Sequence, residues 1–234
     1  VNNVDSLSDS AIDSILNDGV SLSVYDLDTG LVDHVWSKDD NGERTYTKYG
    51  YDSGGTLVFT LSGGRRADVD SVSQISASNV RSLSRSQVNS YLSADMSLAV
   101  YDSTGEKIDY VWSKDVDGEL SCTKYHYDTD GTLVYTLTGE TLTAVSNVYG
   151  ISVSNVRSLT SAQIESYLSP NMTLSVYDTG GERVEYILSI DDNNKITKSI
   201  YHYFSGTNDL EYIEQRDLTG GQNKLIGLVY YETY

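Results

Sequence analysis

A spacing of 76 residues runs through the whole sequence. The dipeptide Tyr-Asp begins at positions 25, 101 and 177, and the segment Asn-Val-Arg-Ser-Leu at 79–83 returns at 155–159. Self-similarity at a fixed spacing is typical of tandem arrays, in which neighbouring units share buried surface. The sequence therefore predicts three units, 7–82, 83–158 and 159–234. Residues 1–6 match the end of a unit, so we expect them to be the tail of a preceding one.

The third unit leaves the common pattern after Tyr203. A hairpin-like pair of apolar runs replaces the connector that would lead into a fourth unit. Terminal repeats are commonly atypical because they close a face that inner repeats bury. We expect a divergent C-terminal cap whose last strand can pair with another chain. The candidate residues of this assembly strand are Leu225, Ile226, Leu228, Val229, Tyr230 and Tyr231.

Each unit opens with a short helical pattern and continues as strands. In the first unit, apolar residues recur at helical spacing after Ser8, a residue type suited to a helix N-cap. The segment 20–25 then alternates apolar and polar residues, as a half-buried strand does. Further strand-like runs, separated by turns that contain Gly, follow at 32–36, 44–51 and 56–61.

These patterns predict an α+β fold that is rich in strands. In each of the three tandem 76-residue units we expect a short helix packed on an antiparallel β-meander of four strands. The connector at 145–153 is a candidate fifth strand.

The formal net charge is −18, and acidic residues outnumber basic ones in every unit. Nucleic acids and anionic membrane surfaces bind clustered Lys and Arg, so the charge argues against both as partners. No apolar stretch reaches the length that spans a bilayer, so we expect no membrane insertion. The single cysteine, Cys122, cannot form an intrachain disulfide, which suits a bacterial secreted chain and a reduced cytosol equally.

Paired carboxylates at three turns are candidate calcium ligands. Two aspartates two residues apart with a glycine nearby can direct carboxylate and carbonyl oxygens at one calcium ion. None of the turns has the full twelve-residue calcium loop, and turns also select Asp for its local hydrogen bonds. Calcium at these turns is therefore a candidate only, and we otherwise expect no cofactor. The pairs are Asp26 and Asp28, Asp115 and Asp117, and Asp128 and Asp130.

Aromatic residues form a second candidate site. Tyrosines two apart share one side of a strand, and tryptophans from a neighbouring strand could extend that side. An exposed aromatic strip suits stacking on sugar rings or on a flat partner, while cross-strand packing is the alternative. The residues of this candidate face are Trp36, Tyr49, Tyr51, Trp112, Tyr125, Tyr127, Tyr201 and Tyr203.

Histidines change between the units, which argues against catalysis. His126 and His202 stand at equivalent positions, but the first unit has Gly50 there. A histidine that is absent from one of the repeats is a poor candidate for a general base. The sequence also lacks a nucleophile-elbow motif, a phosphate-binding glycine loop and a cluster of Cys and His. We predict that the chain is not an enzyme.

The segments Tyr51-Asp52-Ser53-Gly54-Gly55-Thr56-Leu57 and Tyr127-Asp128-Thr129-Asp130-Gly131-Thr132-Leu133 resemble the hairpin signature of bacterial YD-repeat surface and secreted proteins. The resemblance covers one hairpin in each of these units, and a helix interrupts every unit where the family has none. The stretch from Ile151 to Asp178 is also similar to the helix-then-strand repeats of large secreted bacterial adhesins. Both resemblances imply an extracellular or cell-surface bacterial repeat protein.

The leading hypothesis is therefore a structural or adhesive repeat module of a bacterial filament, surface layer or adhesin. Its expected partners are copies of itself, joined head to tail, or a surface or matrix ligand. The alternative is a carbohydrate-binding module of a secreted protein.

Overall fold

The structure is a computed structural model that describes residues 8–231. The expected tail at 1–6 lies outside these residues. The chain divides into two compact units, one ending at Ser121 and the other beginning at Cys122. The boundary falls inside the strand β7 (Leu120–Tyr127) and coincides with neither expected boundary, after residue 82 or after residue 158.

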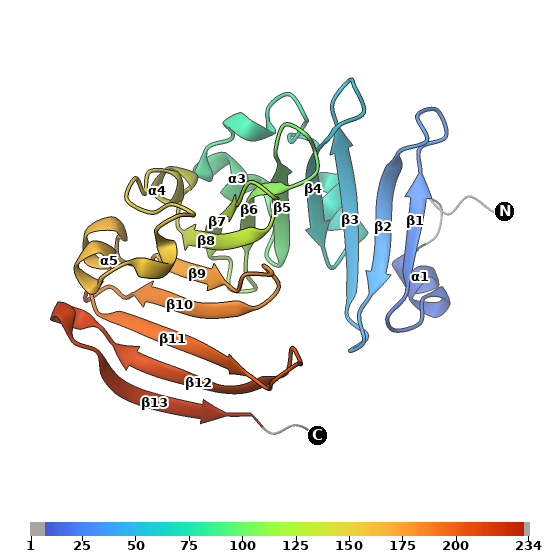
Figure 1. The fold of residues 1–234 in the computed structure, drawn as a ribbon. Helices are drawn as coiled ribbons and strands as arrows, with labels where there is room; N and C mark the ends of the chain where they lie inside the picture. Colours follow the sequence, from blue (N-terminus) through green and yellow to red (C-terminus); the bar gives the residue numbers. More distant parts are fainter. Residues whose placement is uncertain (1–7, 232–234) are drawn as a thin grey trace. The chain divides into compact units, whose positions relative to one another are not determined.

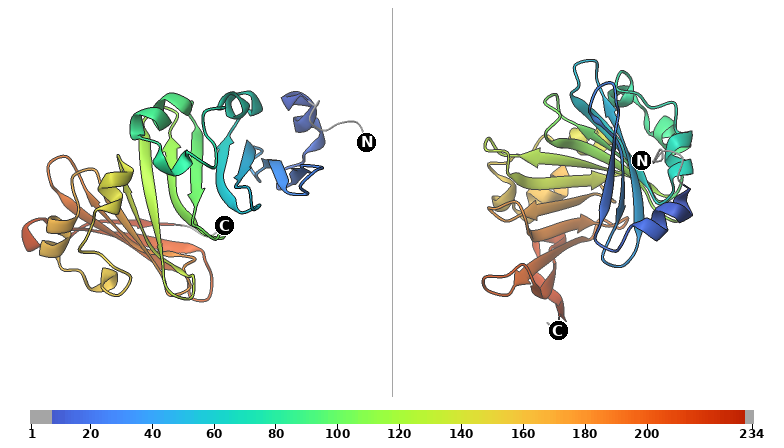
Figure 2. Two further views of the ribbon diagram at one scale, coloured as in Figure 1. Left: turned by 90° about the horizontal axis from the view of Figure 1, so that it is seen from above. Right: turned by 90° about the vertical axis from the view of Figure 1, so that its right-hand side faces the viewer.

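In the first compact unit, short helices alternate with antiparallel strands that lie in chain order (Figure 1). Figure 2 shows the three helices on the same side of these strands. The helices are α1 (Asp9–Ile15), α2 (Arg66–Ser71) and α3 (Arg85–Tyr91), with a 3-10 turn, η2 (Val80–Ser82). The strands are β1 (Ser21–Tyr25), β2 (Val32–Lys38), β3 (Arg44–Tyr51), β4 (Leu57–Gly63), β5 (Met96–Tyr101) and β6 (Ile108–Lys114).

The second compact unit has the same kind of order, from β7 to the final strand β13. Its helices are α4 (Leu142–Ser146) and α5 (Ser161–Tyr167), with 3-10 turns η3 (Val156–Ser158) and η4 (Thr219–Gly221). Its further strands are β8 (Leu133–Gly139), β9 (Thr173–Tyr177), β10 (Val184–Ile190), β11 (Ile196–Tyr203), β12 (Leu210–Asp217) and β13 (Lys224–Tyr230).

The structure confirms the strand-rich character, the antiparallel meander order and the C-terminal hairpin, which is β12 and β13. The candidate fifth strand at 145–153 is wrong, because α4 begins before it and no strand lies there. The helix forms here because Thr141 caps its N-terminus: the Thr141 hydroxyl accepts a hydrogen bond from the amide of Ala144. Division into three units remains an interpretation of the sequence.

Three seven-residue helices begin after residues suited to capping, as predicted. They are α1, α3 and α5, and their N-caps Ser8, Ser84 and Thr160 each accept a hydrogen bond from an amide three residues on. Helices of this length are unstable alone in water, so tertiary packing must hold them. Each buries an apolar side chain almost completely: Ile12, Val88 and Ile164.

The two sides of the strands differ in chemistry. On the helix face of the first compact unit, Trp36 lies opposite Tyr46, and the Tyr46 hydroxyl donates a 3.2 Å hydrogen bond to Asp70 of α2. On the opposite side, which we call the open face, one cross-strand row consists of Ser23, Val35, Thr47, Ser62, Ser97 and Ser113. The corresponding open-face row of the second compact unit is Thr123, Thr138, Thr173, Ser189, Thr197 and Asp217.

Gly50 allows an aromatic ring to lie across β3. A Cβ atom at this position would be 2.1 Å from the Cε1 atom of Phe59, which lies opposite on β4. In the second compact unit, histidines take the equivalent places and stack on tyrosines instead. The ring centroids of His126 and Tyr135 are 4.2 Å apart, and those of His202 and Tyr212 are 4.1 Å apart.

Gly50→Ala should therefore destabilise the first compact unit by about 1–3 kcal/mol, because the Phe59 ring must move out of a packed position. Urea unfolding followed by circular dichroism would measure the change. Gly54→Ala is the matched control, since a Cβ atom there would come no closer than 3.3 Å to a side chain, the Asp52 carboxylate. Equal stability of the two variants would contradict this account of Gly50.

Candidate binding face

Tyrosines gather on the open face in three groups, which we call the tyrosine trios. The first trio consists of Tyr49 and Tyr51 on β3 and Tyr101 at the end of β5. Burial and then the neighbouring phenol of Tyr101 raise the pKa of Tyr49, and burial and then Tyr49 raise that of Tyr51. These effects agree with the register of β3, β4 and β5, which places the three side chains on one face. The raised pKa values of Tyr49 and Tyr51 favour the protonated hydroxyl, which can donate a hydrogen bond.

The second and third trios belong to the second compact unit. Tyr125 and Tyr127 on β7 form the second trio with Tyr177 of β9, and burial and then Tyr177 raise the pKa of Tyr125. Tyr201 and Tyr203 on β11 form the third trio with Tyr231, and burial and then Tyr231 raise the pKa of Tyr201.

The sequence missed one member of each trio. Tyr101 and Tyr177 are visible in the sequence only as markers of the 76-residue spacing, and Tyr231 only as part of the last strand. The signal that could have found them is the strand register. Tyr49 lies opposite Thr60 and Thr60 opposite Ala99, so Tyr101, two residues beyond Ala99, shares the face of Tyr49.

The two tryptophans do not belong to this face, which corrects the prediction. Trp36 is 0% exposed and Trp112 is 2% exposed. Trp36 packs on the helix face against Tyr46, with ring centroids 4.6 Å apart. Strand alternation explains the error, because Tyr46 and Tyr49 are three residues apart on β3 and so point to opposite sides.

Hydroxyl groups lie beside the trios on the same face. Thr47 and Ser62 are hydrogen-bonded across β3 and β4 at 2.9 Å, and Thr123 and Thr138 across β7 and β8 at 2.9 Å. Such pairs stabilise neighbouring strands and leave remaining donors and acceptors at the surface. The open face therefore combines half-buried phenol rings with rows of hydroxyl groups, which suits ligands that are both flat and polar.

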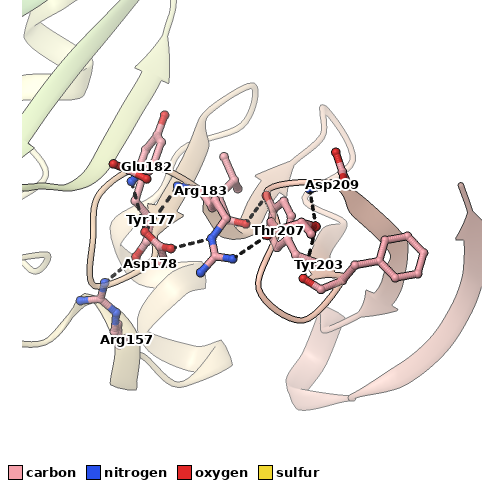
Figure 3. A network of polar contacts seen from close by, with 10 residues as sticks. Arg157, Tyr177, Asp178, Glu182, Arg183, Tyr203, Thr207 and Asp209 are labelled. Atoms are coloured by element: carbon pink, nitrogen blue, oxygen red, sulfur yellow. Dashed lines mark hydrogen bonds and ion pairs between the residues drawn. The ribbon is translucent and has the colours of Figure 1, made fainter. Parts of the chain in front are cut away.

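A charged network adjoins the third trio (Figure 3). The guanidinium of Arg183 donates to Asp178 at 2.8 Å and to the carbonyl oxygen of Thr207 at 3.1 Å, and it lies 5.3 Å from the centre of the Tyr203 ring. The hydroxyl of Tyr203 donates to the carbonyl oxygen of Val184 at 2.9 Å. This network fixes one tyrosine of the trio in place. A hollow of about 330 Å³ opens here, lined among others by Asp178, Arg183, Glu185, Tyr201, Tyr203 and Glu211.

The Asp178 carboxylate predicts a loss of stability in acid. Burial acts to raise its pKa, but hydrogen bonds from Arg183 and from two backbone amides outweigh burial and lower it. A carboxylate whose folded pKa is depressed stabilises the fold above the unfolded pKa of about 3.9 and loses that effect as pH falls through the folded value. Asp178→Asn should therefore destabilise the protein at pH 7, and the difference from the original chain should disappear near pH 2.

Melting temperatures of both chains between pH 2 and pH 7 would check this expectation. Asp130→Asn, in an exposed turn, is the control and should change little at either end of the range. A destabilisation by Asp178→Asn that stays constant with pH would show that the ionised carboxylate is not responsible.

The aspartates predicted to bind calcium serve their own turns. The Oδ1 atom of Asp26 accepts hydrogen bonds from the amides of Asp28 and Thr29 and from the Thr29 hydroxyl. These hydrogen bonds lower the pKa of Asp26, and the bond from the Thr29 amide has the largest effect. The Oδ1 atom of Asp115 accepts from the amides of Asp117 and Glu119, and that of Asp128 from Asp130 and Thr132. Within residues 8–231, no three carboxylate, histidine or cysteine groups converge as metal ligands would.

The candidate assembly strand is the exposed β13. Its register places Leu228 opposite Glu214 and Tyr230 opposite Tyr212, so β12 pairs with one edge. Among the described strands no other pairs with β13. Its apolar side chains remain between 44% and 70% exposed.

No helix within the described part of the chain is long and apolar enough to cross a bilayer. No protein-family model matches the chain, and no curated protein matches it. The crystal structures of TcdB2-TccC3-Cdc42 and of TcdB2-TccC3 are similar in part, each with a TM-score of 0.30 and 13% sequence identity. The matches cover 88% and 91% of this chain but only 9% and 8% of those chains. Likeness at this level transfers neither a fold nor a function, so the YD-repeat resemblance continues to rest on its hairpin residues.

Proposed function

We propose that this chain is a non-catalytic structural or adhesive repeat module of a bacterial cell-surface or extracellular assembly, and that the tyrosine trios form its contact face. The recurrence of the trio supports the proposal: the same arrangement of three phenols is built three times, at Tyr49, Tyr125 and Tyr201. A repeated weak site gains strength when several copies bind one extended ligand. The module needs no cofactor for such contacts.

The trios suit a ligand with flat, hydroxylated surfaces. Tyrosine rings offer a large apolar area at a small entropic cost, and their hydroxyl groups add hydrogen bonds. The carboxylates of Glu185 and Glu211 beside the third trio can accept hydrogen bonds from hydroxyl groups. These features also favour the second candidate, a carbohydrate-binding module, so the test must separate a protein surface from a polysaccharide.

Retention on two insoluble probes makes that separation: chitin beads, and beads coated with collagen. The variant Tyr49→Ser/Tyr125→Ser/Tyr201→Ser removes one ring from each trio. At about 1 kcal/mol for each ring, roughly fivefold in affinity, it should weaken retention on the correct probe by on the order of 100-fold. The control is Tyr149→Ser, since Tyr149 is 90% exposed and belongs to no trio.

Collagen binding that needs the trios supports the adhesive module, and chitin binding that needs them supports the carbohydrate-binding module. If the triple variant is retained on both probes as well as the original chain, or if neither probe retains the original chain, the trios are not the contact face proposed here.

Self-association through β13 is a separate part of the proposal. A long apolar edge strand is a template for pairing with another chain, and β13 has only Lys224 as a charged residue. Its free edge and its exposed side chains support head-to-tail contact between copies of this protein.

A further inference from the structure

The strand β1 lacks a neighbour that its two counterparts have. β5 pairs with β4 and β6, and β9 pairs with β8 and β10. β1 stands 76 residues before β5 in the sequence, yet within residues 8–231 it pairs with β2 alone. One edge of β1 is therefore open in the place where both counterparts are covered.

The apolar side chains of β1, and that of Val20 just before it, show what a further neighbour would bury. Val20 stands 76 residues before Met96 and 152 before Met172. Met96 is 2% exposed and Met172 is 3% exposed, whereas Val20 is 44% exposed. Leu22 and Val24 are half-buried, although Leu98, Val100, Leu174 and Val176 at the equivalent places are all 0% exposed.

The chain itself shows twice which kind of segment covers this surface. A Cβ atom built on Gly63, at the end of β4, would be 3.0 Å from Met96 and 3.2 Å from Val69 of α2. In the second compact unit, a Cβ atom on Gly139 would be 3.4 Å from Met172 and 3.2 Å from Val145 of α4. In both cases the cover is an antiparallel strand that ends in Gly, followed six residues later by a helical Val. The glycine leaves the room that the methionine occupies.

We propose that the open edge of β1 is a docking site for one further segment of this kind, a strand ending in Gly and a short helix bearing Val, as at 57–72 and 133–147. The incoming strand pairs antiparallel with Ser21–Tyr25 in the register that β4 uses on β5, where Thr60 lies opposite Ala99 and Ser62 opposite Ser97. The incoming Gly and Val cover Val20. The site is independent of the tyrosine trios, which lie on the open face.

Strand β12 of a second copy does not fit this role. Arg216 of β12 occupies the position that Gly63 and Gly139 occupy on β4 and β8. The register shows this, because Arg216 lies opposite Lys198, as Gly63 lies opposite Tyr46 and Gly139 opposite Cys122. An arginine side chain fills the space that the glycine leaves free. The edge of β12 is also taken already, because β13 pairs with it in the register that β5 uses on β4. The docking segment must therefore come from a repeat that retains both the Gly and the Val.

A chain with an added segment tests the proposal. Residues 57–82 are placed ahead of Leu7 in the full chain, replacing residues 1–6, so that the sequence Arg-Ser-Leu at the join is the one found at 81–83. Hydrogen exchange of the backbone amides of Ser21–Tyr25 is then measured. We expect exchange to slow at least tenfold, because the added strand pairs with β1 at a high effective concentration.

Three variants test the specificity. The same extension with Gly63→Arg and Val69→Asp in the added copy should give no protection. In the original positions, Val20→Lys should abolish the protection, while Leu27→Lys should not, since Leu27 is 99% exposed in the following turn. The proposal is overturned if the β1 amides exchange equally fast with either extension, or if Val20→Lys leaves their protection unchanged.

Discussion

Trp112→Ala should lower the free energy of unfolding of the first compact unit by about 3–5 kcal/mol. Trp112 is 2% exposed and lies opposite Leu98, which is 0% exposed. Removing the indole leaves a cavity that the surrounding strands fill only in part. Urea unfolding followed by far-ultraviolet circular dichroism would measure the loss without depending on the indole that is removed.

The chain offers a graded control for this substitution. Leu188 takes the place of the tryptophan on β10, opposite Leu174, and is 1% exposed. Trp112→Leu should therefore cost less than Trp112→Ala, because leucine already fills an equivalent position. Val116→Ala, at a site that is 72% exposed, should stay within about 0.5 kcal/mol. A loss below 1 kcal/mol for Trp112→Ala would show that this tryptophan is not a main part of the core.

Two lysines on β13 should abolish self-association if the strand joins copies of the chain. Ile226 has no partner on β12, because the register passes from Leu225 opposite Arg216 to Gly227 opposite Gln215. Ile226 is 45% exposed and Leu228 is 44% exposed, so each leaves apolar surface free for a contact with another chain. Burying each such side chain in a contact stabilises it by about 1.5–3 kcal/mol, so Ile226→Lys/Leu228→Lys should raise the dissociation constant at least about 100-fold.

Sedimentation of the purified chain over a range of concentrations would measure this effect. The control is Leu27→Lys/Val116→Lys, which adds the same charge at two exposed turn positions. Because it changes the net charge of −18 by the same amount as the test variant, it also controls for the electrostatic repulsion between copies. Added salt should weaken that repulsion. An original chain that stays monomeric at high concentration, or a β13 variant that associates unchanged, would exclude this strand as the contact.

The sequence was most informative where a single local signal decides the structure. Ser84 and Thr160 each precede a Gln at the third helical position, and both form reciprocal capping boxes. Alternation likewise located the strands closely. The connector at 145–153 failed because its apolar residues suit a strand, while the Thr141 cap ahead of it starts a helix.

The candidate face could be predicted only in part, because a face depends on contacts between strands. Alternation correctly paired Tyr49 with Tyr51, but it does not say which side of a strand the helices cover. The tryptophans were placed on the wrong side for that reason. Tyr101 belongs to the first trio because of how β3, β4 and β5 are aligned with one another. That alignment includes a register shift between β3 and β4 at Gly50 and Tyr51. No signal within a single strand contains that information.

The chain order of the strands bears on how such a protein folds and evolves. Every strand described within a compact unit pairs with strands next to it in the sequence, and most of these pairs are joined by a short turn, whereas β4 pairs with β5 and β8 with β9 across a helical connector. Chains with such local contacts fold quickly for their size, and pairing can begin while later residues are still being synthesised. A gene duplication that inserts one more repeat would add strand pairs at a junction without breaking those on either side. Length is thus a property that selection can change in steps of one repeat.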